Sequence, residues 1–250
     1  MALAQSARKI VPLILLLISS GLAACSSTNA ALSIGQLVPD GAIRKQAEAD
    51  GRYGALNEEK FPVRAVNLSR IDEQYLRQFV DFETREHPGT IVIDTEKRFL
   101  YLVQEEGKAI RYGIGVGVAG LEFTGEAVVG FKRQWPRWTP TTDMIRRNPE
   151  LYEQWRGGME PGPTNPLGAR ALYLFKDGKD TLYRIHGTTE PHTIGKAVSS
   201  GCIRMLNHDA IDLYRRVPAG AKVVVLGGRV ATASAAPPGV PEMAEQVTLP

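Results

Sequence analysis

A histidine and a cysteine sixteen positions apart constrain the fold of this 250-residue chain most, because their joint chemistry requires them side by side. Cys202 stands in the run Ser199-Ser200-Gly201-Cys202-Ile203-Arg204, and His186 precedes it in His186-Gly187-Thr188. A thiol reacts as its thiolate, and an adjacent histidine can take its proton. Glycine at 201 lets the backbone turn sharply and aim main-chain N–H groups at an oxyanion. The pattern predicts a site for acyl transfer that the fold must assemble.

Two other interpretations of Cys202 have to be weighed. A free cysteine can be an inert, buried, small apolar residue, although a glycine neighbour is unusual for that role. A zinc site can also be drawn from four residues: His186, His192, Cys202 and His208. Their spacing matches neither the short pairs of structural zinc sites nor a two-histidine helix. We therefore expect no metal and no other cofactor.

The N-terminal residues have the composition of an export signal. Arg8 and Lys9 precede an apolar run at 10–18, which is shorter than the roughly 20 residues that span a bilayer. The segment Leu22-Ala23-Ala24-Cys25 resembles a bacterial lipoprotein box, so we expect a signal peptide over 1–24 and a lipid on Cys25; an ordinary signal peptide is the alternative. Cys202 then has no disulfide partner within the chain. Because Ser26 follows Cys25, we expect an anchor on the periplasmic side of the envelope, with the outer membrane favoured.

The charge of the chain gives no indication of a nucleic-acid partner. Residues 1–24 carry two bases and no acid, so their removal lowers the formal net charge from +3 to +1. A phosphate backbone requires a concentrated basic patch, and the excess of bases here is too small to supply one.

The composition divides the chain into five parts. After the signal at 1–24 we expect a tether at 25–61 that holds a short helix near 44–50, a lead-in at 62–88 and one catalytic domain at 89–227. The remaining residues, 228–250, are rich in alanine and proline and are expected to be a disordered tail.

The central part has the pattern of a mainly β domain. Strands are expected at 91–93, 98–103, 109–116, 171–175, 182–186 and 223–226. The first three form a meander, so we expect antiparallel pairing there, and Arg170 and Tyr173 are expected to face solvent and to pack on the sheet, respectively. Asn207 is expected to cap a helix that Pro218 and Gly220 end, and a second helical stretch at 142–155 is broken by Pro149.

Several ordered motifs together resemble the L,D-transpeptidase (YkuD) catalytic domain. They are His186-Gly187-Thr188, the run from Ser199 to Arg204, residues 165–172, Thr139-Pro140 and Met144-Ile145, and they cover roughly 89–226. The resemblance implies a β-sandwich with a few short helices and a capping loop. It also implies an enzyme that remodels peptidoglycan stem peptides without ATP or metal.

The resemblance assigns a role to each matching residue. Cys202 would be the nucleophile that forms a thioester, His186 its general base, and Gly187 the carbonyl that orients the imidazole. The amides of Gly201 and Cys202 would hold the oxyanion. Substrate contacts would come from four further residues: Arg204 to a carboxylate, Ser199, Ser200 and Trp138.

One position departs from the common pattern of that family. Many members have a histidine immediately before the Gly-Cys pair, where this chain has Ser200. In this chain the role of that histidine is taken by Ser200 or by another group such as His192, or it is not filled at all.

The three tryptophans of the chain lie within 21 residues, at 135, 138 and 155, in a stretch rich in glycine and proline. They could belong to a flap that covers a peptide and excludes water, or to a satellite core beneath a long loop. Different rings could serve each purpose.

We therefore expect a lipid-anchored L,D-transpeptidase whose partners are peptidoglycan stem peptides and the membrane. The acyl acceptor stays open: a second stem peptide would give a crosslink, an envelope protein would be anchored, and water would give carboxypeptidase activity. Two alternatives remain, a noncatalytic peptidoglycan-binding lipoprotein and a secreted cysteine peptidase that cleaves all-L substrates.

Overall fold

The computed structural model describes residues 41–117, 123–199 and 201–227, without the side chain of Ser199. The expected signal peptide, the lipidation at Cys25, the first part of the tether and the C-terminal tail lie outside these residues, as does Ser200. No helix within the described ranges is long and apolar enough to cross a bilayer.

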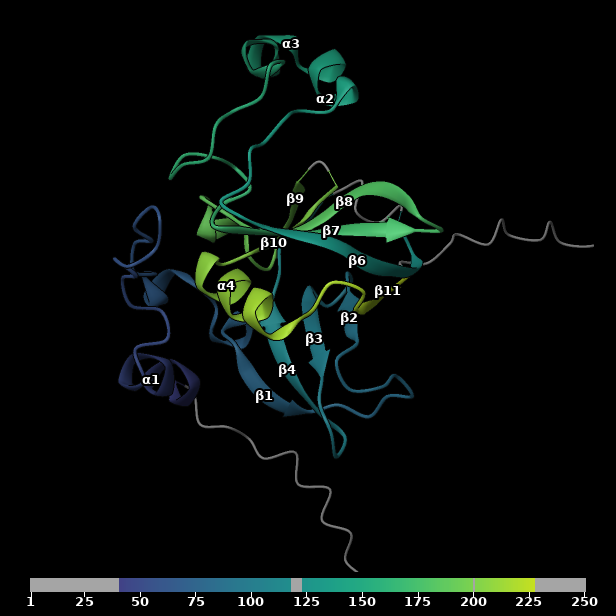
Figure 1. Cartoon of the computed structure of the whole chain (residues 1–250). Coiled ribbons are helices and arrows are strands. Elements are labelled where there is room, and N and C mark those ends of the chain that lie inside the picture. The colour runs from purple at the N-terminus through teal and green to yellow at the C-terminus, as the bar shows by residue number, and fades with distance from the viewer. Residues whose placement is uncertain (1–40, 118–122, 200, 228–250) are drawn as a thin grey trace, which may run out of the picture. The chain divides into compact units, whose positions relative to one another are not determined.

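The described chain is mainly β with a few short helices, which confirms the expected fold class (Figure 1). The strands are β1 Gln78–Asp81, β2 Ile91–Asp94, β3 Phe99–Val103, β4 Lys108–Gly113, β5 Val116–Gly117, β6 Gly125–Gln134, β7 Arg170–Lys176, β8 Lys179–Gly187, β9 Ala197–Ser199, β10 Ile203–Met205 and β11 Lys222–Leu226. The helices are α1 Ala42–Ala49, α2 Thr142–Arg147, α3 Pro149–Tyr152 and α4 Asn207–Arg216, with 3₁₀ turns at Leu68–Arg70, Glu73–Tyr75, Glu153–Trp155 and Pro191–Thr193.

Nine strands form one sheet in the order β1-β4-β3-β2-β11-β6-β7-β8-β10, and β5 pairs with β9 separately. In Figure 1 the strands β6, β7 and β8 run across the direction of β2, β3 and β4, as expected for a strongly twisted sheet. Side chains from both halves share one core, which includes Ile91, Leu100, Leu172 and Ile185. Leu213 of α4 belongs to the same core.

The meander predicted at 91–116 is confirmed for its first two strands and is shorter in its third. β2 pairs antiparallel with β3 and β3 with β4, with Leu100 opposite Tyr112. Every residue of β2 and β3 is buried, which explains their continuous apolar runs. β4 ends at Gly113, because Gly115 then bridges to Arg204 and Val116 begins β5.

The expectation of antiparallel pairing does not extend to the whole sheet. β11 pairs parallel with β2, and β10 pairs parallel with β8. β6, which lies between β11 and β7, was not predicted, nor were the short strands β1 and β10. The two parallel pairings join segments far apart in the sequence, so no local hairpin signal announces them.

The helical stretch at 142–155 is divided as predicted. Thr141 caps α2, and Asn148 caps α3 with Pro149 in its first turn. Figure 1 shows α2 and α3 at the end of two long connecting segments, away from the sheet.

Residues 41–61 are folded onto the domain, which corrects the expectation that they form part of a tether. Tyr53 is 2% exposed, and its hydroxyl donates to Asp209 of α4 at 3.1 Å. Glu59, which is partly buried, pairs at 2.6 Å with the buried Arg170. Arg170 was expected to face solvent; it lies inside because Glu59 neutralises its charge there.

Candidate active site

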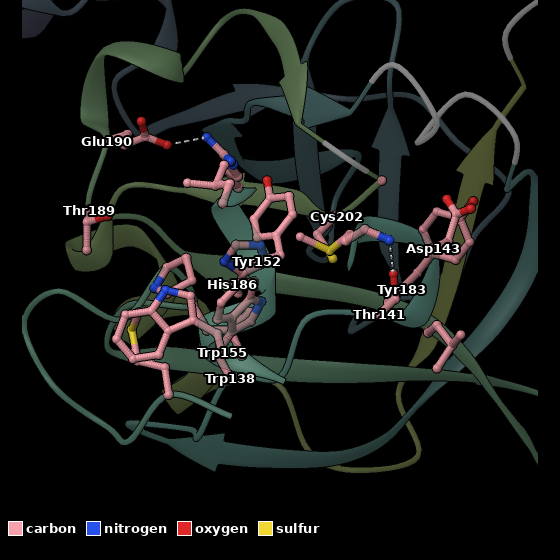
Figure 2. A pocket seen from close by; sticks show the side chains of 18 of the residues that line it. Trp138, Thr141, Asp143, Tyr152, Trp155, Tyr183, His186, Thr189, Glu190 and Cys202 are labelled. Carbon is pink, nitrogen blue, oxygen red and sulfur yellow. Dashed lines mark hydrogen bonds and ion pairs between the residues drawn. The ribbon is translucent and has the colours of Figure 1, made fainter. Parts of the chain in front are cut away.

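The parallel pairing of β8 and β10 brings His186 and Cys202 together. Ile203 lies opposite Ile185 and Arg204 opposite His186, so Cys202, which immediately precedes β10, lies beside Arg184. His186 and Cys202 both line a cavity of about 610 Å³. Figure 2 shows the sulfur and the imidazole facing this catalytic cavity.

His186 is held as a neutral base. Its Nδ1 lies 2.5 Å from the carbonyl oxygen of Gly187, and a carbonyl only accepts, so Nδ1 carries the proton and Nε2 keeps its lone pair. The pKa of His186 is lowered to about 4, chiefly by burial and also by the charges of Arg204 and Arg184, while backbone hydrogen bonds of Gly187 and Leu167 act in the opposite direction. At neutral pH the imidazole can therefore accept a proton.

Cys202 is held as a protonated thiol. Burial raises its pKa, while a backbone hydrogen bond from Arg184 and the charges of Arg184 and Arg204 act in the opposite direction. The resting pair is therefore a neutral thiol and a neutral imidazole.

Gly201 has a backbone conformation that side chains disfavour. Its φ is +135°, whereas a Cβ built at this position would meet only one atom of Tyr183, at 3.8 Å. The glycine is thus required by its dihedral angle and not by lack of space. Its neighbour Ser200, and the side chain of Ser199, lie outside the described residues, so their expected substrate contacts stay predictions.

Asn207 clamps the backbone behind His186, a role that the sequence did not reveal. Its Oδ1 accepts from the Ala169 amide at 2.9 Å, and its Nδ2 donates to the Thr188 carbonyl at 3.1 Å. The cap position of α4 is Leu206, so the predicted capping role of Asn207 was wrong. Gly187 makes the clamp possible, because a Cβ there would lie 2.1 Å from Asn207 Oδ1.

Arg204 reaches the catalytic cavity, as expected, and is already paired. Its Nη1 donates to Glu190 Oε2 at 2.8 Å, and Glu190 is exposed. Figure 2 draws this contact at one end of the cavity, with Asp143 at the other. Exposed ion pairs of this kind contribute only about 0–1 kcal/mol, so a ligand carboxylate can replace Glu190.

The three tryptophans divide between the two predicted roles. Trp138 and Trp155 line the catalytic cavity, where Trp138 meets Tyr152 edge-on with ring centroids 6.1 Å apart. Trp135 instead is buried in a satellite core and packs edge-on against Phe61 at 5.1 Å.

His192 lies apart from the catalytic cavity. It is exposed and lines a second cavity, so it does not take the place of the missing histidine beside Cys202. Across the part of the chain that the structure describes, no group of three His, Cys, Asp or Glu side chains is arranged to hold a metal ion.

By amino-acid sequence, the chain is similar to proteins named as L,D-transpeptidases. Two proteins of Escherichia coli K12, named "Probable L,D-transpeptidase ErfK/SrfK" and "Probable L,D-transpeptidase YbiS", are 35% and 34% identical over 140 and 139 residues. Each match covers 55% of this chain and 44% of the relative, so the chain spans less than half the length of these proteins.

Among solved structures, a Brucella melitensis protein described as a "Probable carnitine operon oxidoreductase caia" is 56% identical. The match covers 64% of this chain and 99% of that one, with a TM-score of 0.45. A family model described as the L,D-transpeptidase catalytic domain matches residues 88–225, which is more than half of the chain. The chain therefore belongs to the YkuD family of L,D-transpeptidase catalytic domains.

Proposed function

We propose that this protein is an L,D-transpeptidase that acts on peptidoglycan stem peptides through a thioester on Cys202. The observation that carries the proposal is the neutral pair: a thiol and an imidazole in one cavity, with the imidazole proton held on Nδ1 by Gly187. That arrangement suits a nucleophile activated by an adjacent base.

In the first half-reaction His186 Nε2 takes the thiol proton as sulfur attacks the carbonyl between a stem diamino acid and a terminal D-alanine. The amides of Gly201 and Cys202 donate to the resulting oxyanion. The C–N bond then breaks, and the leaving amine takes the proton from His186. The donor peptide remains on sulfur as a thioester, and D-alanine departs.

In the second half-reaction an amine attacks the thioester. The new C–N bond forms, the C–S bond breaks, and the amine proton passes through His186 to the thiolate, which restores the resting pair. Trp138 and Trp155, which line the catalytic cavity, limit the access of water, and this favours transfer over hydrolysis. A stem peptide or an envelope protein can supply the amine.

Arg204 serves the donor in this scheme. A carboxylate of the stem peptide replaces Glu190 on its guanidinium, which forms charge-assisted hydrogen bonds with carboxylates. We further propose that a lipid on Cys25 anchors the enzyme on the periplasmic side of the outer membrane. Labelling with a radioactive fatty acid should mark the wild-type protein and not Cys25→Ala.

Intact-protein mass spectrometry tests the enzyme. The reduced protein is incubated with a carbapenem and, separately, with a diaminopimelate-containing tetrapeptide plus an amine acceptor. We expect an adduct, release of D-alanine and a joined product, all absent in Cys202→Ala. A reduced thiol that forms no adduct and turns over no peptide contradicts the proposal, and retained binding would then favour a noncatalytic lipoprotein. Cleavage of all-L peptides would instead indicate a cysteine peptidase.

A further inference from the structure

A second cavity, of about 530 Å³, adjoins the catalytic cavity. One wall is formed by residues 62–71, which precede the part of the chain that matches the family model. Thr188, Thr189, Pro191 and His192 also line it. Thr164 and Thr189 line both cavities, so a ligand in the second cavity lies next to the space in front of Cys202.

The second cavity carries positive charge from two arginines. Arg64 and Arg70 line it, both are exposed, and neither forms an ion pair with a described acidic group. Its described lining includes no Asp or Glu, whereas the catalytic cavity has Asp143 and Glu190.

The rest of the wall is suited to a peptide. Ile71, Trp135 and Pro191 give it apolar surface, and the exposed Thr164 and Thr189 offer hydroxyl groups where the two cavities meet. His208, which is 4% exposed, is held by a 2.6 Å contact between its Nε2 and the Gly54 carbonyl. Its imidazole is fixed as part of the wall, so the arginines provide the charge.

We propose that the second cavity binds the acyl acceptor, a peptide that carries a free carboxylate close to its reacting amine, as diaminopimelate does. The inference rests on the proposed function, which requires the donor thioester and the acceptor to be present together. With the donor in the catalytic cavity, an acceptor whose carboxylate pairs with Arg64 and Arg70 approaches the thioester past Thr164 and Thr189. The cavity thus selects the acceptor by charge.

The test separates the two half-reactions in the full-length protein with Arg64→Ala and Arg70→Ala combined. Acylation by a carbapenem reports the first, and transfer to a diaminopimelate tripeptide at increasing concentrations reports the second. We expect unchanged acylation and an acceptor KM raised about tenfold, the effect of losing about 1.4 kcal/mol of carboxylate binding. Transfer to the same tripeptide with its carboxylates amidated should be equally slow in both proteins.

Two further variants sharpen the result. Arg85→Ala removes an exposed arginine that lines neither cavity and should leave both half-reactions unchanged. Changing Arg64 and Arg70 to Lys keeps the charge and should restore most of the acceptor affinity. An unchanged acceptor KM in the double alanine variant, or an equal loss with the amidated tripeptide, overturns the acceptor site.

Direct binding keeps this inference distinct from the proposed function. In the Cys202→Ala background no turnover occurs. Calorimetry then measures tripeptide binding to this protein with and without the Arg64→Ala and Arg70→Ala changes. The difference in affinity reports the contribution of the second cavity. Binding that depends on these arginines supports a carboxylate site even if the wild-type protein forms no thioester. Binding that is indifferent to them contradicts the site even if acylation proceeds.

Discussion

At the scale of single residues, the structure sets the protonation of the reacting pair through burial. Burial lowers the pKa of His186 to about 4 and raises the pKa of Cys202, so each group is displaced toward its neutral form. A thiolate–imidazolium ion pair would have required a raised pKa for His186 and a lowered pKa for Cys202. The enzyme therefore rests with the proton on sulfur.

This assignment predicts the pH dependence of carbapenem acylation. The imidazole loses its basic lone pair only when it is protonated, so the rate should fall on the acid side near pH 4 and stay level from about pH 5 to 8. His186→Ala should lower the pH-independent acylation rate by about 10²–10⁴-fold. Mass spectrometry of adduct formation at pH 4–9 measures both the pH profile and the effect of His186→Ala. Half-maximal activity near pH 6.5 would contradict the neutral pair.

Gly201→Ala tests the backbone at the oxyanion site. A side chain at φ +135° costs about 1–3 kcal/mol of strain even though there is space for it. Relief of that strain would turn the amides of 201 and 202, and loss of one oxyanion donor lowers rates by about 10²–10³-fold. Gly220→Ala is the matched control. Gly220 also has a positive φ, +86°, a Cβ added there would meet open space, and the residue lies outside both cavities. It should lower the melting temperature and spare acylation; equal acylation in both variants would refute the role of Gly201.

At the scale of elements, α4 holds the active-site strands in place through its first residue. Asn207 ties the start of β7 to the chain that leaves β8, immediately after His186 and Gly187. Because Gly187 carries the carbonyl that orients the imidazole, the clamp fixes the direction of Nε2 through the backbone. Asn207 is thus a positioning residue.

Asn207→Ala should leave the buried Ala169 amide without an acceptor, at a cost of about 1–3 kcal/mol in unfolding free energy. Acylation should also fall, and its acid limb should shift, because the imidazole is no longer held against Gly187. Asn207→Asp keeps the acceptor for Ala169 and should recover part of the stability. Urea unfolding and the pH profile of acylation measure these effects; a loss of stability with an unchanged profile would show that Asn207 is only structural.

At the scale of the whole molecule, residues that precede the family-matched region complete the domain. Tyr53 and Leu76 are almost fully buried, β1 extends the sheet beside β4, and Glu59 neutralises the buried Arg170. Residues 62–71 also form a wall of the second cavity. The catalytic region would lose packing, charge balance and a proposed acceptor site without them.

Glu59→Gln tests whether the Glu59–Arg170 pair holds the preceding segment on the domain, because it replaces one carboxylate oxygen with an amide nitrogen. It leaves the buried Arg170 without its counter-charge, and a buried polar group that loses its partner costs about 1–3 kcal/mol. The melting temperature should fall markedly, as measured by circular dichroism. Glu58→Gln, at an exposed neighbouring acid, is the control and should have little effect. Equal melting temperatures for the two variants would mean that the pair does not hold the segment.

Local sequence pattern was sufficient to predict several strands and to single out two candidate reacting residues. β2, β3, β7, β8 and β11 were predicted because apolar and β-branched runs are legible in any short window. His186 and Cys202 were identified because their chemistry requires those residue types, and the surrounding motif placed them in a family. These features depend on neighbours within a few positions.

Other features were decided by contacts between distant parts of the chain. The register of β10 on β8, the burial of Arg170 against Glu59 and the clamp by Asn207 each join residues whose separation no local pattern encodes. Side-chain chemistry and local periodicity, which are readable in the sequence, predicted Cys202 and His186 as the candidate reacting groups and located most of the strands. The protonation of these two groups and the alignment of the strands follow from the folded chain, because burial and long-range pairing exist only once the chain has folded.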